Sequence, residues 1–185
     1  MKTRVLEDEI TYTGAQLRSG WIAEAAGVEG DAVVAFFGPC DVAPEHMVDQ
    51  EDLAAGARIF SPRMLHVIVE HPGLDLAHIT TRQRLLMAIA GELLNAHLGE
   101  ALLRREGDDL YFRDLKLSVS VATTSPRSGL IHSGFNLRGE GAPVPAIGLE
   151  ELGLVPREFA EELLAAYAAE ITGAEQAAGK VKRVG

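Results

Sequence analysis

Polar side chains at alternate positions mark the stretch Gly107–Leu137 as the chemically most informative part of the sequence. Apolar and small polar residues alternate through Lys116–Thr123 and again through Leu130–Leu137, which is typical of strands joined by a hairpin. Neighbouring side chains of a strand point to opposite faces, so each strand presents one polar row. The two rows consist of Lys116, Ser118 and Ser120, and of His132, Gly134 and Asn136.

The hairpin loop decides which members of the two rows lie side by side. Gly134, in the middle of its row, would let a ligand approach the backbone closely. On the strand that begins at Lys116, the side chains of the other face, which include Leu117, Val119 and Val121, are then expected to face the core. A cation, hydroxyls, an imidazole and an amide on one sheet face predict a small-molecule binding surface. With Thr124–Gly129 as the loop, the predicted pairs are Ser120 with His132, Ser118 with Gly134, and Lys116 with Asn136.

The use of lysine singles out Lys116. Only four of the 17 basic residues are lysines, and the other three lie near the ends of the chain. An ammonium on a flexible stem binds a carboxylate or phosphate as a point charge, unlike a planar guanidinium. A solvated strand lysine and a ligand-binding lysine both fit the spacing.

Cys40 is the only cysteine, which excludes an internal disulfide and a Cys-x-x-Cys zinc site. It follows an apolar run and a Gly-Pro turn, where a nearby cation such as Lys116 would lower the thiol pKa and make it a nucleophile. The alternative is a small buried hydrophobic residue. The six histidines share no ligand spacing, so we expect no metal site.

Composition and charge narrow the class of protein. A chain of 185 residues with 47% hydrophobic content suffices for one globular domain, and we expect a single domain over residues 1–185. The formal net charge of −10 argues against general nucleic-acid binding, which needs many cations. The N-terminus lacks an apolar signal segment, and the longest apolar run, Ala32–Phe37, is too short to span a bilayer. We therefore expect a cytoplasmic protein without a membrane partner.

The elements that must position these side chains follow from hydrophobic spacing. Capping-box pairs predict one helix after Thr13 that ends at Gly27, and a second from Thr80 to Gly99. Pro156 begins a last helix. The predicted strands are Val5–Thr11, Ala32–Phe37, Met64–Glu70, the two alternating runs, and Lys180–Val184, with a loop over Val42–Gly56. This order indicates an α+β fold with a mixed or antiparallel central sheet flanked by helices.

In this arrangement the chain resembles the catalytic core of the biotin and lipoate protein ligases, which share the class II aminoacyl-tRNA synthetase fold. The opening strand of the family's meander matches Asp108–Tyr111, its lysine strand matches Lys116–Ser120, and its third strand matches His132–Leu137. The chain as a whole is also similar to an uncharacterised group known as domain of unknown function 366, through Ala35–Asp41 and Leu117–Ser120. That second resemblance implies no activity.

The ligase resemblance implies that a carboxylic acid and ATP form an acyl-adenylate, whose acyl group passes to a lysine of a carrier protein. Lys116 would contact the carboxylate and the α-phosphate, and Asp109 would orient the site or help hold Mg²⁺. The implied partners are a small carboxylic acid or nucleotide and a carrier protein, with a homodimer as an expected assembly. The further binding residues would be Gly56, Arg58, Ser118, Ser120, His132, Gly134 and Asn136.

One segment departs from the ligase pattern. Ligases wrap the nucleotide phosphates with a loop rich in glycine and arginine, but only Gly56 and Arg58 remain of it within Asp49–Phe60. The acidic residues there would repel phosphate unless Mg²⁺ bridged them. Two alternatives therefore stay open, an ATP-independent acyltransferase that uses Cys40 and a non-catalytic ligand-binding or assembly protein.

Overall fold

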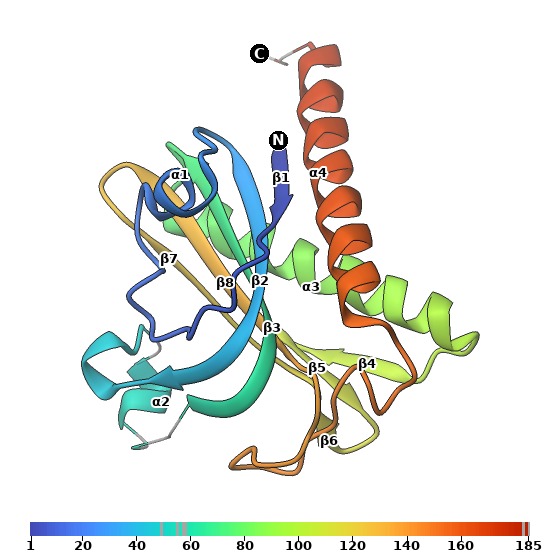
Figure 1. Cartoon of the computed structure of the whole chain (residues 1–185). Coiled ribbons are helices and arrows are strands. Elements are labelled where there is room, and N and C mark those ends of the chain that lie inside the picture. The colour runs from blue at the N-terminus through green and yellow to red at the C-terminus, as the bar shows by residue number, and fades with distance from the viewer. Residues whose placement is uncertain (49, 55, 57–58, 183, 185) are drawn as a thin grey trace.

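The apolar runs of the sequence form the two longest strands, which lie side by side at the centre of a five-stranded sheet. The computed structural model describes residues 1–48, 50–54, 56, 59–182 and 184. The strand order is β1-β2-β3-β8-β7, with β1 parallel to β2 and the other pairs antiparallel (Figure 1). The bounds are β1 Lys2–Val5, β2 Ala32–Val42, β3 Ile59–Pro72, β7 Ser118–Thr124 and β8 Ser128–Asn136.

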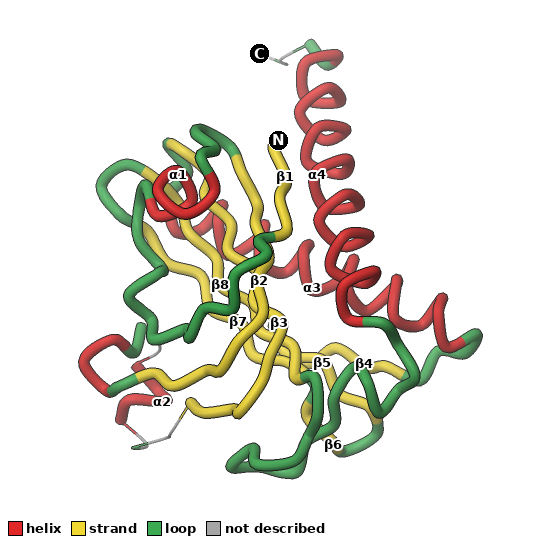
Figure 2. Tube along the Cα trace, viewed as in Figure 1, coloured by secondary structure: helices red, strands yellow, loops and turns green. Residues whose placement is uncertain are grey.

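A second, smaller sheet stands apart from the long strands (Figure 2). It consists of β4 (Leu103–Glu106), β5 (Asp109–Phe112) and β6 (Leu115–Lys116). Lys116 therefore belongs to the small sheet, and the chain enters the large sheet two residues later. Lys116 also forms a backbone bridge with Ala146, so it pairs with Tyr111 of β5 and with Ala146.

The large sheet has a different cover on each face. Helices α3 (Leu76–Leu98) and α4 (Pro156–Lys180) pack on one face and bury the larger core, which includes Leu65, Phe135 and Tyr167. The other face carries α1 (Trp21–Ala26) and the preceding N-terminal loop over a smaller core. The short helices η1 (Pro44–His46) and α2 (Gln50–Ala54) follow β2. No described helix is both long and apolar enough to cross a bilayer.

The predicted α+β fold with a mixed central sheet and flanking helices is confirmed, but several boundaries were wrong. The first strand is Lys2–Val5 instead of Val5–Thr11. Helix α3 begins after Asp75, whose carboxylate accepts a hydrogen bond from the His78 amide, so Thr80 lies inside the helix. Helix α4 continues to Lys180 because its last turns are rich in alanine, glutamate and glutamine. The described residues beyond it form no strand.

The predicted register of the hairpin was wrong by one residue. Ser120 lies opposite Ser133, and Val121 lies opposite His132. This slip turns Ser118 and Ser120 towards the helical face and Val119 and Val121 towards the face of His132. Hydrogen bonding explains why two serines are tolerated on the buried side. Ser118 Oγ accepts from the Leu110 amide at 2.9 Å, and Ser120 Oγ lies 2.8 Å from Ser133 Oγ.

Candidate functional site

Two adjoining cavities open on the sheet face that carries α1 and the N-terminal loop. Their volumes are similar, about 180 and 150 Å³. Lys116, Val119 and Ile59 line both and form the partition between them. Polar side chains such as Asp108 and His132 line the first cavity, whereas apolar side chains such as Met64 dominate the second.

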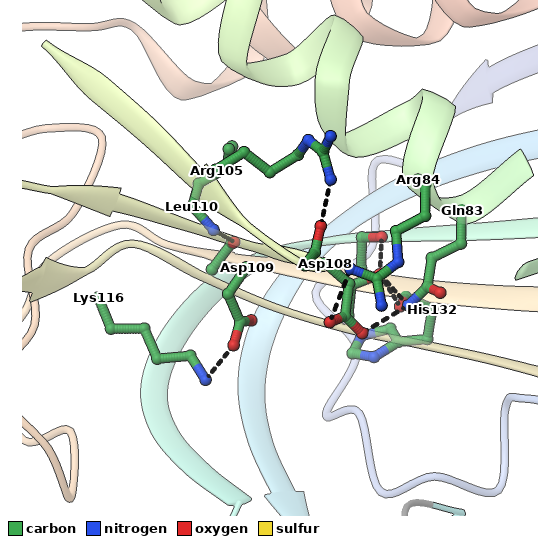
Figure 3. A network of polar contacts seen from close by, with 12 residues as sticks. Gln83, Arg84, Arg105, Asp108, Asp109, Leu110, Lys116 and His132 are labelled. Carbon is green, nitrogen blue, oxygen red and sulfur yellow. Dashed lines mark hydrogen bonds and ion pairs between the residues drawn. The ribbon is translucent and has the colours of Figure 1, made fainter. Parts of the chain in front are cut away.

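Lys116 meets its counter-ion at this partition. Its ammonium Nζ lies 2.7 Å from Asp109 Oδ2, and both side chains are about three-quarters buried, with 27% and 22% of their surface exposed. Figure 3 shows the two side chains pointing towards each other from β6 and β5. The pairing of β5 with β6 places them there, because Tyr111 lies opposite Lys116 in the ladder. A cation held in a fixed place next to a cavity can bind a carboxylate or phosphate group.

Asp108 anchors a second network that joins β5 to α3 (Figure 3). Gln83 donates from Nε2 to Asp108 Oδ2 at 2.9 Å and to Ser120 Oγ at 3.1 Å, and Arg84 forms an ion pair with Asp108 at 3.6 Å. Ser120 Oγ lies 3.2 Å from the His132 carbonyl oxygen. Gln83 is the second member of the capping-box pair that begins with Thr80, and that pattern predicts a cap and not this network. The network fixes the wall that separates the first cavity from α3.

Tyr12 also lines the first cavity, and the buried His66 contacts His132 without being among the residues that line it; the sequence patterns predicted neither contact. The Tyr12 ring stacks on His132 with centroids 3.6 Å apart, while His66 Nδ1 lies 3.1 Å from His132 Nε2. The backbone of Tyr12 is held against the β2 bulge by hydrogen bonds to Pro39 and from Asp41. At Gly38 the Ile10 backbone comes so close that a Cβ would lie 2.1 Å from its carbonyl oxygen. No local pattern around Tyr12 signals this long-range contact.

Cys40 lies in the wall of the second cavity, which Lys116 also lines. Its side chain is fully buried, and burial raises the pKa of the thiol to about 12, with a smaller contribution from the charge of Asp41. A thiol with such a pKa is almost entirely protonated at neutral pH and is a weak nucleophile. Asn136 lines the same cavity, and its Nδ2 donates to the Lys116 carbonyl oxygen at 3.3 Å.

The residues expected to contact phosphate are not gathered in the same way. Gly56 is exposed and is not among the described residues that line either cavity. Arg58 and Asp49 lie outside the described residues. Gly134 is not among the described residues that line either cavity, and an added Cβ there would come within 2.8 Å of the Met64 methyl carbon. Gly134 therefore makes room for a protein side chain, and Ser118 lines only the second cavity.

The charges of the first cavity bear on the cofactors that the ligase resemblance implies. Two carboxylates and one ammonium line it, so a bare triphosphate would meet net repulsion. Carboxylate oxygens are ligands for Mg²⁺, and the donor set therefore fits a magnesium-bound nucleotide better than a free one. Within the described part of the chain no cluster of three His, Cys, Asp or Glu side chains is arranged to hold a metal.

The fold defines a class of protein. The chain superposes on a biotin protein ligase from Aquifex aeolicus in complex with biotin and ATP with a TM-score of 0.57, over 93% of this chain and 69% of the ligase, at 11% identity. It also superposes on a putative lipoate protein ligase from T. acidophilum with bound lipoic acid, with a TM-score of 0.54, over 92% and 85% of the chains, at 13% identity. The fold is that of the biotin and lipoate ligases.

The particular family follows from closer similarity. Residues 1–182 match the family DUF366, a domain of unknown function, and the chain belongs to it. A protein of unknown function from Pyrococcus horikoshi has 40% sequence identity and a TM-score of 0.93, over 100% of this chain and 99% of that one. Both resemblances predicted from the sequence are thus confirmed. The activity of the family is not established by either.

Proposed function

We propose that this protein is an acyl-handling enzyme of the biotin and lipoate ligase type. It binds a small-molecule carboxylic acid with the carboxylate at Lys116. The observation that carries this proposal is the ammonium of Lys116 at the partition of two cavities, held there by Asp109 at 2.7 Å. The ligase fold supports it, because one solved structure with this fold is a complex with biotin and ATP and another holds lipoic acid.

In this proposal each side chain of the pair has a distinct role. Lys116 places positive charge beside the carboxylate of the substrate. The same charge lies beside the negative charge that builds up when the carboxylate oxygen attacks the α-phosphate of ATP. A preorganised cation in a site that excludes water stabilises such charge strongly. Asp109 keeps the ammonium in place, and it is a positioning residue in this scheme. ATP, when bound, would supply an adenylyl group, because a carboxylate oxygen that bonds to the α-phosphorus displaces pyrophosphate as the bond between that phosphorus and the β-phosphate oxygen breaks.

The test is carboxylate-dependent exchange of labelled pyrophosphate into ATP. We would offer biotin, lipoate, octanoate and amino acids in turn, in the presence of Mg²⁺. One acid should support exchange, and Lys116→Ala should reduce its rate by roughly 10²–10³-fold, as the loss of one preorganised donor does. Lys182→Ala, which removes an exposed lysine far from the site, is the matched control. Folded protein that exchanges with none of these acids would reject adenylation of them.

A second candidate is ATP-independent acyl transfer through Cys40. The observation in its favour is that Cys40 and Lys116 line the same cavity. It would require a substrate to displace the groups that now bury the thiol. If no exchange occurs, transfer of an octanoyl group from an acyl thioester to a carrier protein, lost in Cys40→Ala, would support this candidate.

A further inference from the structure

Two buried histidines form a chain of hydrogen bonds, and one of them, His132, lines the first cavity. His66 and His132 lie on neighbouring strands, and 0% and 3% of their surfaces are exposed. His66 Nε2 lies 3.2 Å from the Gly38 carbonyl oxygen, and His66 Nδ1 lies 3.1 Å from His132 Nε2. His132 is the terminal member of this chain and the one that lines the cavity.

The Gly38 carbonyl determines where the protons of both rings lie. A carbonyl oxygen only accepts hydrogen bonds, so His66 must carry its proton on Nε2. The other nitrogen of a neutral imidazole is then an acceptor, and His132 must donate to it from Nε2. It follows that His132 has its lone pair on Nδ1.

This Nδ1 atom keeps an opening to the cavity. No described residue donates to it. In the described part of the chain the fully buried side-chain atoms without a partner are Ser61 Oγ and Arg82 Nη1, and His132 Nδ1 is not one of them, so it is not fully buried. The Tyr12 ring lies almost parallel to the imidazole, at 9°, and prevents the ring from turning. His132 thus presents an acceptor in a fixed orientation.

The charge state of the pair makes this acceptor permanent at physiological pH. Burial lowers the pKa of His66 to about 4 and the pKa of His132 well below its ordinary value, and the two rings disfavour each other's protonation. The groups that face the pair are the Tyr12 phenol, whose pKa burial raises, and the Gly38 carbonyl. A neutral acceptor in this position binds a donor without taking its proton.

We infer that His132 Nδ1 recognises a hydrogen-bond donor on the tail of the ligand, such as a hydroxyl, amide or urea group. This inference rests on the proposed function, in which the carboxylate of the same ligand lies at Lys116. Tyr12 would lie beside the tail, and the donor would meet His132 Nδ1, to which no described residue donates. The preferred ligand is a carboxylic acid with a polar tail, and a pure hydrocarbon tail would leave Nδ1 buried without a partner.

Matched acids test this preference directly. We would measure, by calorimetry, the binding of ω-hydroxy fatty acids of several chain lengths, with the ω-methoxy and unsubstituted acids of equal length. The methoxy group keeps the oxygen and removes the donor. At the best length, the hydroxy acid should bind roughly tenfold more tightly, in line with one net hydrogen bond. Equal affinities for hydroxy and methoxy acids would overturn the inference.

Variants assign the preference to the histidines. His132→Phe keeps a ring for Tyr12 to stack on and should bind the hydroxy and methoxy acids equally. His66→Phe removes the acceptor that fixes the tautomer and should weaken the preference. His97→Phe changes an exposed histidine paired with Glu162 and should leave the preference intact. A preference that survives His132→Phe would place the donor elsewhere and reject the role of His132.

Two further measurements need no variant and separate this inference from the proposed function. Long-range proton–nitrogen NMR spectra of the wild-type protein should show both imidazoles neutral with the proton on Nε2, and a proton on His132 Nδ1 would reject the inference. A cyclic urea without a carboxylate is the second probe. Its addition should shift the His132 Nδ1 resonance. If that shift occurs while no acid binds, donor recognition stands and the carboxylic acid is rejected; no shift with any donor probe rejects donor recognition.

Discussion

At the scale of single residues, the environment decides which side chains of the site are reactive. Lys116 keeps a partly exposed ammonium because Asp109 lies beside it, and both face space that a ligand can enter. Cys40 borders the same region, but burial favours its neutral thiol, and the charge of Asp41 acts in the same direction. By residue type alone, Lys116 and Cys40 are equally good candidates for a functional group. Their surroundings favour Lys116.

The burial of Cys40 predicts slow alkylation. Because the thiol pKa is raised to about 12, iodoacetamide should label the native protein at pH 8 at least roughly 100-fold more slowly than the urea-unfolded protein. Mass spectrometry at timed intervals gives both rates. Cys40→Ala should keep full pyrophosphate exchange under the leading proposal. Rapid labelling of the native protein, or loss of exchange in a folded Cys40→Ala protein, would instead favour the thiol as a nucleophile.

At the scale of elements, local patterns predicted which segments are helices and strands, and tertiary contacts decided their ends and register. The alternation over Leu130–Leu137 was sufficient to find β8 and the inward row of His132 and Asn136. The serines of β7 faced the other way because the small sheet ends at Lys116 and Leu117 is drawn into the helical core. Nothing local predicts that, and the same holds for the loop residue Tyr12.

The start of α3 provides a test of capping at this scale. Asp75 accepts a hydrogen bond from the His78 amide, so Asp75→Ala should lower the free energy of unfolding by about 1 kcal/mol. Thr80, which the sequence pattern favoured as the cap, bonds back to the Leu76 carbonyl inside the helix, and Thr80→Ala should cost less than about 0.5 kcal/mol. Urea titrations at pH 7 give both values.

Asp75→Asn is the control for the charge of Asp75, because asparagine caps a helix as well as aspartate does. It should retain most of the stability that Asp75→Ala loses. If Thr80→Ala were the more damaging change, the helix would begin five residues later, with Thr80 as its cap in place of Asp75.

At the scale of the whole molecule, each face of the sheet holds a polar network within an apolar core. His66 and His132 lie on the cavity face, while His71 lies at the end of β3 between Asp31 and α4. His71 Nδ1 is 2.7 Å from the Asp31 carboxylate, and its Nε2 is 2.9 Å from the Tyr167 hydroxyl. These contacts tie α4 to the strands, and burial lowers the pKa of His71 despite the opposing effect of Asp31.

Three histidines with lowered pKa make the stability of the fold sensitive to mild acid. The unfolded chain protonates them near pH 6.5, whereas the folded protein resists protonation until lower pH, about 4 for His66. The unfolded state therefore binds more protons as the pH falls below 6.5, and the free energy of unfolding must decrease, by roughly 1 kcal/mol per pH unit for each histidine.

Urea titrations between pH 7 and pH 5 measure this slope above the range in which carboxylates titrate. His71→Gln should reduce the slope, because it removes one group whose pKa is lowered by folding. A free energy of unfolding that stays constant from pH 7 to pH 5 would mean that the buried rings accept protons in the folded state, and it would remove the basis for a permanently neutral His132.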